Sequence, residues 1–383
     1  MQHREQADFE SFTCGRQAAG RNERSGNLMA EYQQGGMYDQ GRMYHELGRK
    51  YEHGDGVAQS DSEAAHWYEQ AAQHGSTHAQ HSLGIFYEAG RGVKQSDSQA
   101  AHWYRLAADQ GDARSQLRLA RLYKQGGGVP RDHAQAARLF RLAADQGIAD
   151  AQVELGALHD QGLGVPKDMA RAVALFRQAA EQRHAQAEYY LGLCHARGIG
   201  AVKSTVTAAY WFRLAATQGH AGAQVELGSI LLQSHGVARS DEAAARWFRL
   251  AAEQGLASGQ FNIGFLHAIG RGVPRSDAEA LRWYRLSAAQ GFNAARNNLA
   301  QFFEDGRAVE QSDVDAVKLY RLAANGGLHN AQCNLGRMYE LGRGVPMSSA
   351  DAVAWYQRAA ANGNQLAHEA LRRLLESDRK TAS

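Results

Sequence analysis

The residues whose spacing could support chemistry are histidines and short glycine-containing strings. His45-Glu46 begins the pattern of a zinc protease, which needs a second histidine four residues after the first, but Arg49 stands there. The string from Gly198 to Ser204 resembles a phosphate-binding loop, but Val202 occupies the position where that loop needs glycine. Because neither motif is complete, we predict no catalytic residue and no enzymatic activity.

Isolated histidines and cysteines also argue against a metal centre. His159, His195 and His267 share one position of a repeated pattern, which would separate neighbouring copies by about 10 Å. Such histidines are expected to be half-buried structural residues. The three cysteines contain no Cys-x-x-Cys pair, and Cys194 falls among apolar residues, as an inert core thiol would. We therefore expect no metal site and no cofactor.

Composition excludes several classes of partner. The chain has 383 residues, with 42 Lys and Arg against 40 Asp and Glu, so its formal net charge is only +2. This balance offers no electrostatic surface for nucleic acid or an anionic membrane. No apolar run approaches the roughly 18 residues of a membrane-spanning helix, so no membrane insertion is expected. Without an apolar segment near the N-terminus, we predict a cytoplasmic location, although export as an effector by a specialised system would leave no recognisable mark.

The positions of all these residues are set by an internal repeat of 36 residues. An aliphatic-then-small pair recurs without insertion or deletion in nine copies, from Leu47-Gly48 to Leu335-Gly336. Twenty residues after each pair comes a pair of large apolar residues such as Trp67-Tyr68, followed by an Ala-Ala pair in all copies but one. A fixed period of this length indicates a stack of identical supersecondary units rather than two or three globular domains.

Each copy is predicted to form two helices. In the second copy Ala79, Leu83 and Phe86 fall on one helical face, and the small residue after Leu83 suggests close approach of a neighbouring helix. Glycines in the following loop then end this helix, with departures at Ser234 and Ala308, and a glycine closes each second helix, with a departure at Arg183. One column of residues can cap the start of every second helix. Its members are Ser60, Ser96, Asp132, Asp168, Ser204, Ser240, Ser276, Ser312 and Ser348.

The two strings Ala79 to Val93 and Ala100 to Gly111 resemble the Sel1-like repeat family, a relative of the tetratricopeptide repeat. The resemblance covers about residues 43 to 375 and implies an all-α fold, a right-handed α/α superhelical solenoid of about nine repeats plus a capping helix. The expected organisation is a polar, disordered tail over 1–27, a degenerate half-repeat or N-terminal cap over 28–42, nine repeats over 43–366, and a C-terminal capping helix and tail over 367–383.

In the related tetratricopeptide fold the first helices line the concave surface, and the resemblance implies the same here. Positions two before and two after the repeated Leu should lie opposite the buried face of each first helix. In the middle copies these positions are apolar, which favours a partner-binding surface. The predicted residues are Tyr189, Leu193, Val225, Phe261 and Phe265. The alternative is that these side chains pack against the preceding copy's second helix.

A second feature of the same face is a column of amides. Asn262, Asn298 and Asn334 each precede the repeated Leu or Ile in three successive copies, and Arg337 lies nearby. Because an amide both donates and accepts, such a ladder could hold an extended peptide backbone, while Arg337 could hold a carboxylate. Recent duplication of these copies would produce the same column without a function.

These features favour a non-catalytic scaffold or adaptor that binds a protein or peptide partner on its concave surface. A solenoid presents a long regular surface and no enclosed pocket. The family resemblance leaves two alternatives open: a regulator or enzyme of bacterial cell-envelope processes, and a secreted effector acting on host proteins. Self-association through the apolar stripe is a third alternative.

Overall fold

The computed structural model describes residues 40–233 and 236–381, with side chains as far as Leu374. All regular elements within these residues are helices, as the sequence predicted. The chain divides into two compact units between Leu175 and Phe176, a point within helix α9 (Met169–Glu181).

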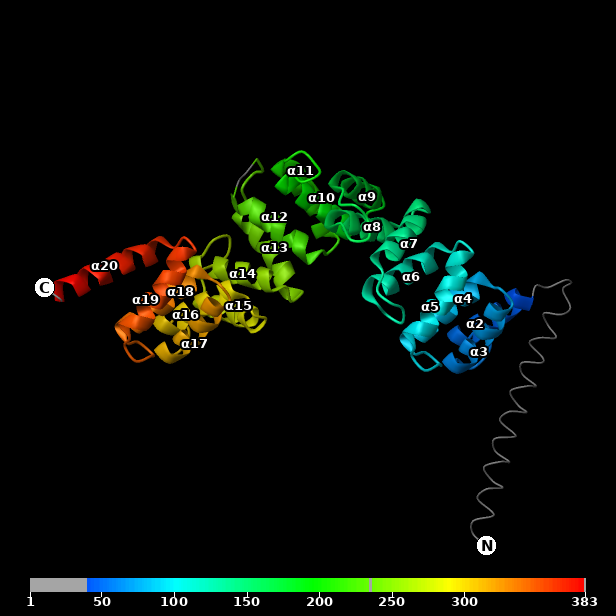
Figure 1. Ribbon diagram of the computed structural model, residues 1–383, viewed down its shortest axis with the longest axis horizontal. Coiled ribbons are helices and arrows are strands. Elements are labelled where there is room, and N and C mark those ends of the chain that lie inside the picture. The colour runs from blue at the N-terminus through cyan, green and yellow to red at the C-terminus, as the bar shows by residue number, and fades with distance from the viewer. Residues whose placement is uncertain (1–39, 234–235, 382–383) are drawn as a thin grey trace, which may run out of the picture. The chain divides into compact units, whose positions relative to one another are not determined.

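Unit 1 contains three complete helical hairpins and the first helix of a fourth. Within each hairpin the two helices pack against one another, and each second helix also contacts the first helix of the next hairpin. Figure 1 shows these hairpins following one another in chain order. The helices are α2 (Gln40–His53), α3 (Asp61–Gln73), α4 (Thr77–Ala89), α5 (Asp97–Asp109), α6 (Ala113–Gln125), α7 (His133–Asp145) and α8 (Ala149–Gln161).

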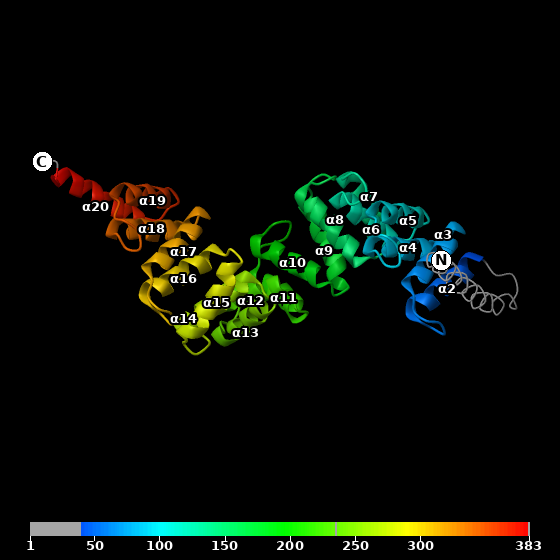
Figure 2. The same ribbon diagram turned by 90° about the horizontal axis from the view of Figure 1, so that it is seen from below.

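Unit 2 repeats the same arrangement. Its helices pair as α10 with α11 and so on to α18 with α19, and α20 packs against α19. Figure 2 shows this succession from a second direction. The helices are α10 (Ala185–Arg197), α11 (Thr205–Thr217), α12 (Ala221–Gln233), α13 (Asp241–Glu253), α14 (Ala257–Ile269), α15 (Asp277–Ala289), α16 (Asn293–Asp305), α17 (Asp313–Asn325), α18 (His329–Leu341), α19 (Ser349–Ala361) and α20 (Gln365–Thr381).

The predicted capping column is confirmed at every copy. Each member accepts a backbone N–H two or three residues later, as when the Ser96 hydroxyl accepts from Gln99 at 3.3 Å. These bonds satisfy N–H groups that have no partner within the helix. The second helix therefore starts at the same place in each copy, which keeps the repeats in register.

Small residues in the first helix accommodate an aromatic ring from the second. A methyl group added at Gly228 would meet the Phe248 ring at 2.7 Å, and one added at Gly336 would meet the Tyr356 ring at 2.9 Å. These rings are almost completely buried. The predicted close helix approach is therefore confirmed, and the neighbour is the second helix of the same copy.

Two departures from the glycine columns keep the backbone shape that glycine provides elsewhere. Arg183 has a φ of 62° and Ala308 a φ of 53°, both in the left-handed region. This conformation costs a residue with a side chain roughly 1–2 kcal/mol. The third departure, Ser234, lies outside the described residues.

Ion pairs between copies reinforce the stack in unit 2. Arg343 donates to both carboxylate oxygens of Asp313 at 3.1 and 2.7 Å, and Arg271 does the same to Asp241 at 2.9 Å for both bonds. Each arginine lies in the loop after a first helix, and each aspartate begins the preceding copy's second helix. Two-pronged pairs of this kind fix geometry as well as adding energy.

The C-terminal helix α20 packs against the last hairpin. Ala367 of α20 is buried, and Leu371 and Leu374 pack beside Tyr356 of the last hairpin. The predicted polar tail over 1–27 and almost all of the segment 28–42 lie outside the described residues, which begin at Gln40.

Candidate partner-binding surface

The predicted surface residues all lie on first helices of unit 2. Tyr189 and Leu193 belong to α10, Val225 to α12, and Phe261 and Phe265 to α14. Helix α12 contacts both α10 and α14, so the three helices lie side by side. We call this set, with Ser229 of α12, the first-helix surface.

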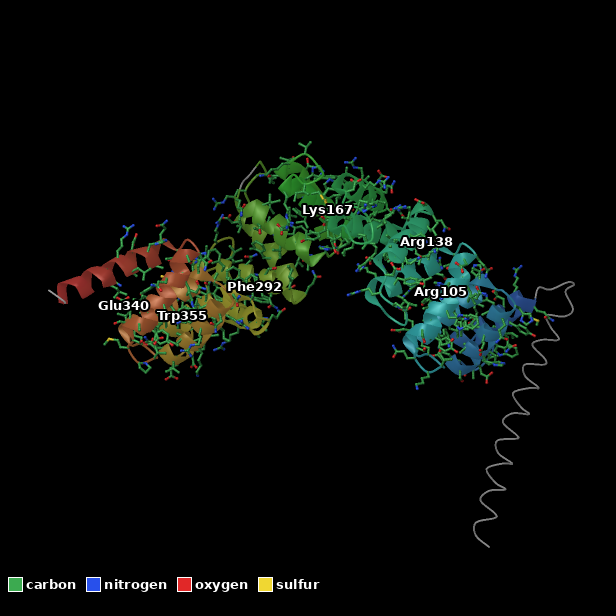
Figure 3. All side chains as sticks on the ribbon, viewed as in Figure 1. Arg105, Arg138, Lys167, Phe292, Glu340 and Trp355 are labelled. Carbon is green, nitrogen blue, oxygen red and sulfur yellow. The ribbon has the colours of Figure 1, made fainter. Side chains whose placement is uncertain are left out.

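Residues two before the repeated Leu lie in the seams between neighbouring first helices. The Tyr189 ring stacks on His220 with centroids 4.4 Å apart, and the Phe261 ring lies 5.3 Å from Phe292. His220 and Phe292, the latter labelled in Figure 3, each precede the first helix of the next copy. The expectation that Tyr189, Val225 and Phe261 lie opposite the buried face is therefore wrong. All three are half-buried, because the next copy covers this flank of the helix.

Residues two after the repeated Leu are more accessible. Phe265 is 40% exposed, and its ring lies 6.5 Å from Phe261 in a nearly parallel orientation. Leu193 is half-buried, and the Ser229 hydroxyl donates to the Val225 carbonyl at 2.9 Å. The most exposed apolar side chain of the first-helix surface is thus Phe265, with the half-buried Phe261 beside it, while the half-buried Leu193 lies on α10, beyond α12.

An acidic group lies near Tyr189, on the neighbouring helix α12. Burial raises the pKa of Glu226 on α12, while the positive charge of Arg197 partly opposes that shift. A partially desolvated carboxylate beside apolar side chains is a specificity feature, because a partner that covers it must supply a hydrogen-bond donor.

The three asparagines do not form an open ladder. Asn298 donates to the Tyr284 hydroxyl at 3.1 Å, and Asn334 donates to the side-chain oxygen of Asn297 at 3.0 Å. Asn297 in turn donates to Asn298 at 3.3 Å, which links the amides of α16 and α18. Among the described residues, no side-chain hydrogen bond is recorded for Asn262. Two of the three amides therefore already contribute to packing within the chain.

Arg337 already holds a carboxylate from its own chain. It donates to both oxygens of Glu304 at 2.8 and 2.7 Å, and Arg343 and Tyr320 also donate to Glu304, each at 2.8 Å. Burial alone would raise the pKa of Glu304, but the hydrogen bonds from Arg337 and Tyr320 hold it below its usual value. A partner carboxylate would have to displace this internal group to reach Arg337.

A second set of polar pairs, between tyrosines and glutamates, was not predicted from the sequence. The buried tyrosine of several second helices donates to a glutamate sixteen residues earlier, as in Tyr104 to Glu88 at 2.6 Å and Tyr356 to Glu340 at 2.7 Å. Copies with phenylalanine at this position lack that glutamate. Tyr284 is the exception, since Ala268 stands sixteen residues earlier and Asn298 donates to its hydroxyl instead. Elsewhere the tyrosine and the glutamate thus occur together in the same copies, and comparing these two positions in the sequence would have predicted the pair.

The histidine column is structural. The Nδ1 atoms of His159, His195 and His267 lie 2.9–3.2 Å from a backbone carbonyl seven residues later. Burial raises the pKa of the Cys333 thiol, and Cys194 is buried. Within the described ranges no three His, Cys, Asp or Glu side chains are grouped to hold a metal ion.

Across the part of the chain that the structure describes, no helix is both long and apolar enough to cross a membrane.

Solved structures supply two close likenesses. The chain is 30% identical to c5321, described as a protective antigen present in uropathogenic Escherichia coli strains displaying an SLR fold, with a TM-score of 0.61 over 88% of this chain and 80% of that chain. It is also 30% identical to a Sel1 repeat protein from Oxalobacter formigenes, with a TM-score of 0.58 over 64% of this chain and 96% of that chain. Among curated proteins, none matches the chain.

The family comparison covers almost all the described helices. The family model for the Sel1 repeat matches nine consecutive segments from residue 42 to residue 364. The segments are 42–76, 77–112, 113–148, 149–184, 185–220, 221–256, 257–292, 293–328 and 329–364. Each contains one hairpin of the structure. The chain therefore belongs to the Sel1 repeat family, and its fold is an all-α solenoid.

Proposed function

We propose that this chain is a non-catalytic scaffold that binds a partner protein or extended peptide across the first-helix surface of unit 2. Sel1 repeat proteins are generally protein-interaction scaffolds. The observation that carries the proposal is the exposure of Phe265, with the Phe261 ring stacked beside it. Accessible aromatic side chains on a regular surface are typical anchors of protein interfaces.

The expected partner segment is apolar where it meets Phe265 and carries a donor for Glu226. Asn262 lies one residue before Ile263 on the same helix and supplies an amide that both donates and accepts. Asn298, Asn334 and Arg337 belong to the proposed surface only as neighbours, since internal bonds already engage them. Binding through α10, α12 and α14 therefore does not require the internal bonds of Asn298, Asn334 and Arg337 to break.

Affinity capture tests this surface. Phe265→Ala removes the exposed ring, and Ser229→Arg places a long charged side chain between Leu193 and Phe265. Leu286→Ala is the matched control, because Leu286 is a similarly exposed apolar residue on a second helix. We expect partners captured from cells that express the protein to survive Leu286→Ala and to be lost from the double variant. Retention of every partner by the double variant would refute the surface.

Two further properties belong to the same proposal. The three widely spaced cysteines of the sequence form no disulfide framework, which suits a reducing compartment, so we place the protein in the cytoplasm. Light scattering over a concentration series separates partner binding from self-association. A dimer that the Phe265→Ala variant abolishes would make a second copy the occupant of this surface.

A further inference from the structure

The first hairpins of unit 1 form a hollow that is lined by arginines, histidines and carboxylates. It has a volume of about 530 Å³ and lies over α2, α4 and the start of α6, where His45, Arg49, His78, His81 and Arg114 line it. A second hollow of about 590 Å³ adjoins it and shares His45, Arg49 and His78. The two together form one open depression across successive first helices.

The acidic groups of the hollow are already engaged. Glu52 accepts from the Tyr68 hydroxyl at 2.5 Å and from Arg91 at 2.9 Å. Asp112 accepts the Ser115 backbone N–H at 2.7 Å as the cap of α6. Arg91 therefore offsets the charge of Glu52, whereas Asp112 keeps its charge and opposes an anion at the α6 end of the hollow.

The arginines of the hollow are less engaged. Among the residues from Gln40 onward that the structure describes, Arg49 has one ion pair, with the exposed Glu46 at 3.6 Å within its own helix. Within residues 40–233, Arg114 has no ion pair. Exposed pairs such as that of Arg49 contribute roughly 0–1 kcal/mol, so both guanidinium groups are available to an incoming anion.

The histidines of the hollow would add positive charge if they became protonated. The His45 ring lies 5.8 Å from the His78 ring and 5.5 Å from Tyr68. Burial lowers the pKa of His45, with Glu46 and Glu52 opposing the shift and His78 and Arg49 adding to it. A bound anion would favour the protonated form of such a ring.

His81 responds in the same way. Its Nδ1 atom lies 2.8 Å from the Ser115 hydroxyl oxygen and 3.5 Å from Asp112. Burial lowers its pKa, Asp112 opposes the shift, and Arg118, Arg114 and His78 add to it. The two rings, neutral without a ligand, would take up protons as an anion enters.

We propose that this hollow binds the carboxylates of an acidic, extended segment of a partner protein. The inference rests on the proposed scaffold function and adds the chemistry of the partner. Neighbouring packed helices lie about 8–10 Å apart, and a polyproline II segment brings every third side chain to the same face at about 3.1 Å per residue. Acidic residues at every third position would therefore meet successive first helices.

A nucleic acid fits the hollow less well. Single-stranded nucleic acid needs aromatic platforms for its bases as well as a charged groove, and Tyr68 and Tyr104 beneath the histidines are buried. The formal net charge of +2 also gives no extended basic surface.

Calorimetric titration of the full chain tests the proposal. The probe is a peptide of four Glu-Pro-Ser triplets, with a Gln-Pro-Ser peptide, citrate and an oligouridylate as comparisons. We expect the Glu peptide to bind at least about tenfold tighter than the Gln peptide, with charge-assisted bonds providing the difference. Its affinity should rise by about threefold or more as the pH falls from about 8 to about 6.

Two double variants, each of which removes two positive charges, serve as the test and its control. Arg49→Gln with Arg114→Gln should weaken the Glu peptide about tenfold or more. Arg105→Gln with Arg138→Gln, two exposed arginines of α5 and α7 that Figure 3 labels, should leave it unchanged. Circular dichroism of both double variants confirms that they fold.

Three results would overturn the acidic-peptide site: equal binding of the Glu and Gln peptides, citrate binding as tightly as the Glu peptide, or oligouridylate binding more tightly than it. Capture that still depends on Phe265 would then leave the scaffold function standing. Conversely, peptide binding that needs Arg49 and Arg114 survives even if the Phe265 surface proves to have no partner.

Discussion

Glu188 interrupts a ladder of glutamines, and replacing it by glutamine should stabilise unit 2. At the equivalent position of other copies a glutamine donates to the carbonyl of the alanine eight residues earlier, at 3.2–3.4 Å. The glutamines are Gln80, Gln116, Gln152, Gln224, Gln260 and Gln332. An ionised carboxylate cannot donate, so Glu188 leaves the Ala180 carbonyl without this bond.

The environment of Glu188 sets the size of the effect. Its side chain is 0% exposed, Gln218 donates to one of its oxygens at 2.6 Å, and the other oxygen lies 3.9 Å from the exposed Arg183 without a hydrogen bond. Restoring one hydrogen bond contributes about 1 kcal/mol, and relieving the poorly satisfied buried carboxylate about 1 kcal/mol more. We therefore expect Glu188→Gln to raise the free energy of unfolding by ~2 kcal/mol near neutral pH.

The gain should depend on pH in a defined direction. Burial raises the pKa of Glu188, although the Gln218 hydrogen bond and the charge of Arg183 oppose the shift. The native state then holds more protons than the unfolded chain, so the stability of the wild type falls as the pH rises above the ordinary carboxyl range. At lower pH the protonated carboxyl can donate as glutamine does, and the difference between the two proteins should shrink.

Urea denaturation followed by circular dichroism at about pH 5 and about pH 8 measures the difference. The matched variant is Gln224→Glu, which places a carboxylate at the same position of the next copy and should destabilise the protein by a similar amount at the higher pH. An equal or lower stability of Glu188→Gln at about pH 8, or a difference that does not change with pH, would refute the reasoning.

Three further predictions test the packing. Ala308→Gly should raise the free energy of unfolding by about 0.5–1 kcal/mol in urea denaturation, because Ala308 has a φ of 53° that glycine adopts without strain; a loss of stability would contradict this. Asn298→Ala should lower it by about 1–2 kcal/mol by removing the bond to the Tyr284 hydroxyl, and adding Ala268→Glu should restore it, as measured by a double-mutant cycle; additive effects would count against the exchange. Phe261→Ala should lower the thermal midpoint in calorimetry, with a loss of about 2–4 kcal/mol, since its ring fills a seam between helices; a near-neutral effect would mean that the ring is a surface group.

Most of the fold was predictable because it depends on local signals repeated many times. The capping column, the helix pairs and the glycines that end the helices each follow from residue type at a fixed offset. A single copy would have been ambiguous. Agreement between columns across the whole series made the assignment secure.

The candidate site was less predictable because a helical wheel describes one helix alone. It gives the angle at which Tyr189 and Phe261 leave the axis, but the next copy decides whether that flank is covered. A helical wheel also gives no information on ion pairs between helices, such as the one between Arg337 and Glu304, which are 33 residues apart in the sequence. Comparing columns with one another, as in the tyrosine and glutamate pairs, would have recovered part of this information.

The arginine pairs between copies have a consequence for how such a chain can change in length. The pairs of the loop arginines with the first aspartate of a second helix each span 30 residues, as from Arg307 to Asp277, with Arg271 and Asp241 one period earlier. If the segment 257–292 were excised, Arg307 would meet Asp241, an aspartate in the same place as its former partner. Loss or gain of a whole 36-residue copy therefore leaves each loop arginine opposite an equivalent aspartate. A shorter deletion would shift the arginine away from the aspartate and break the ion pairs at the junction.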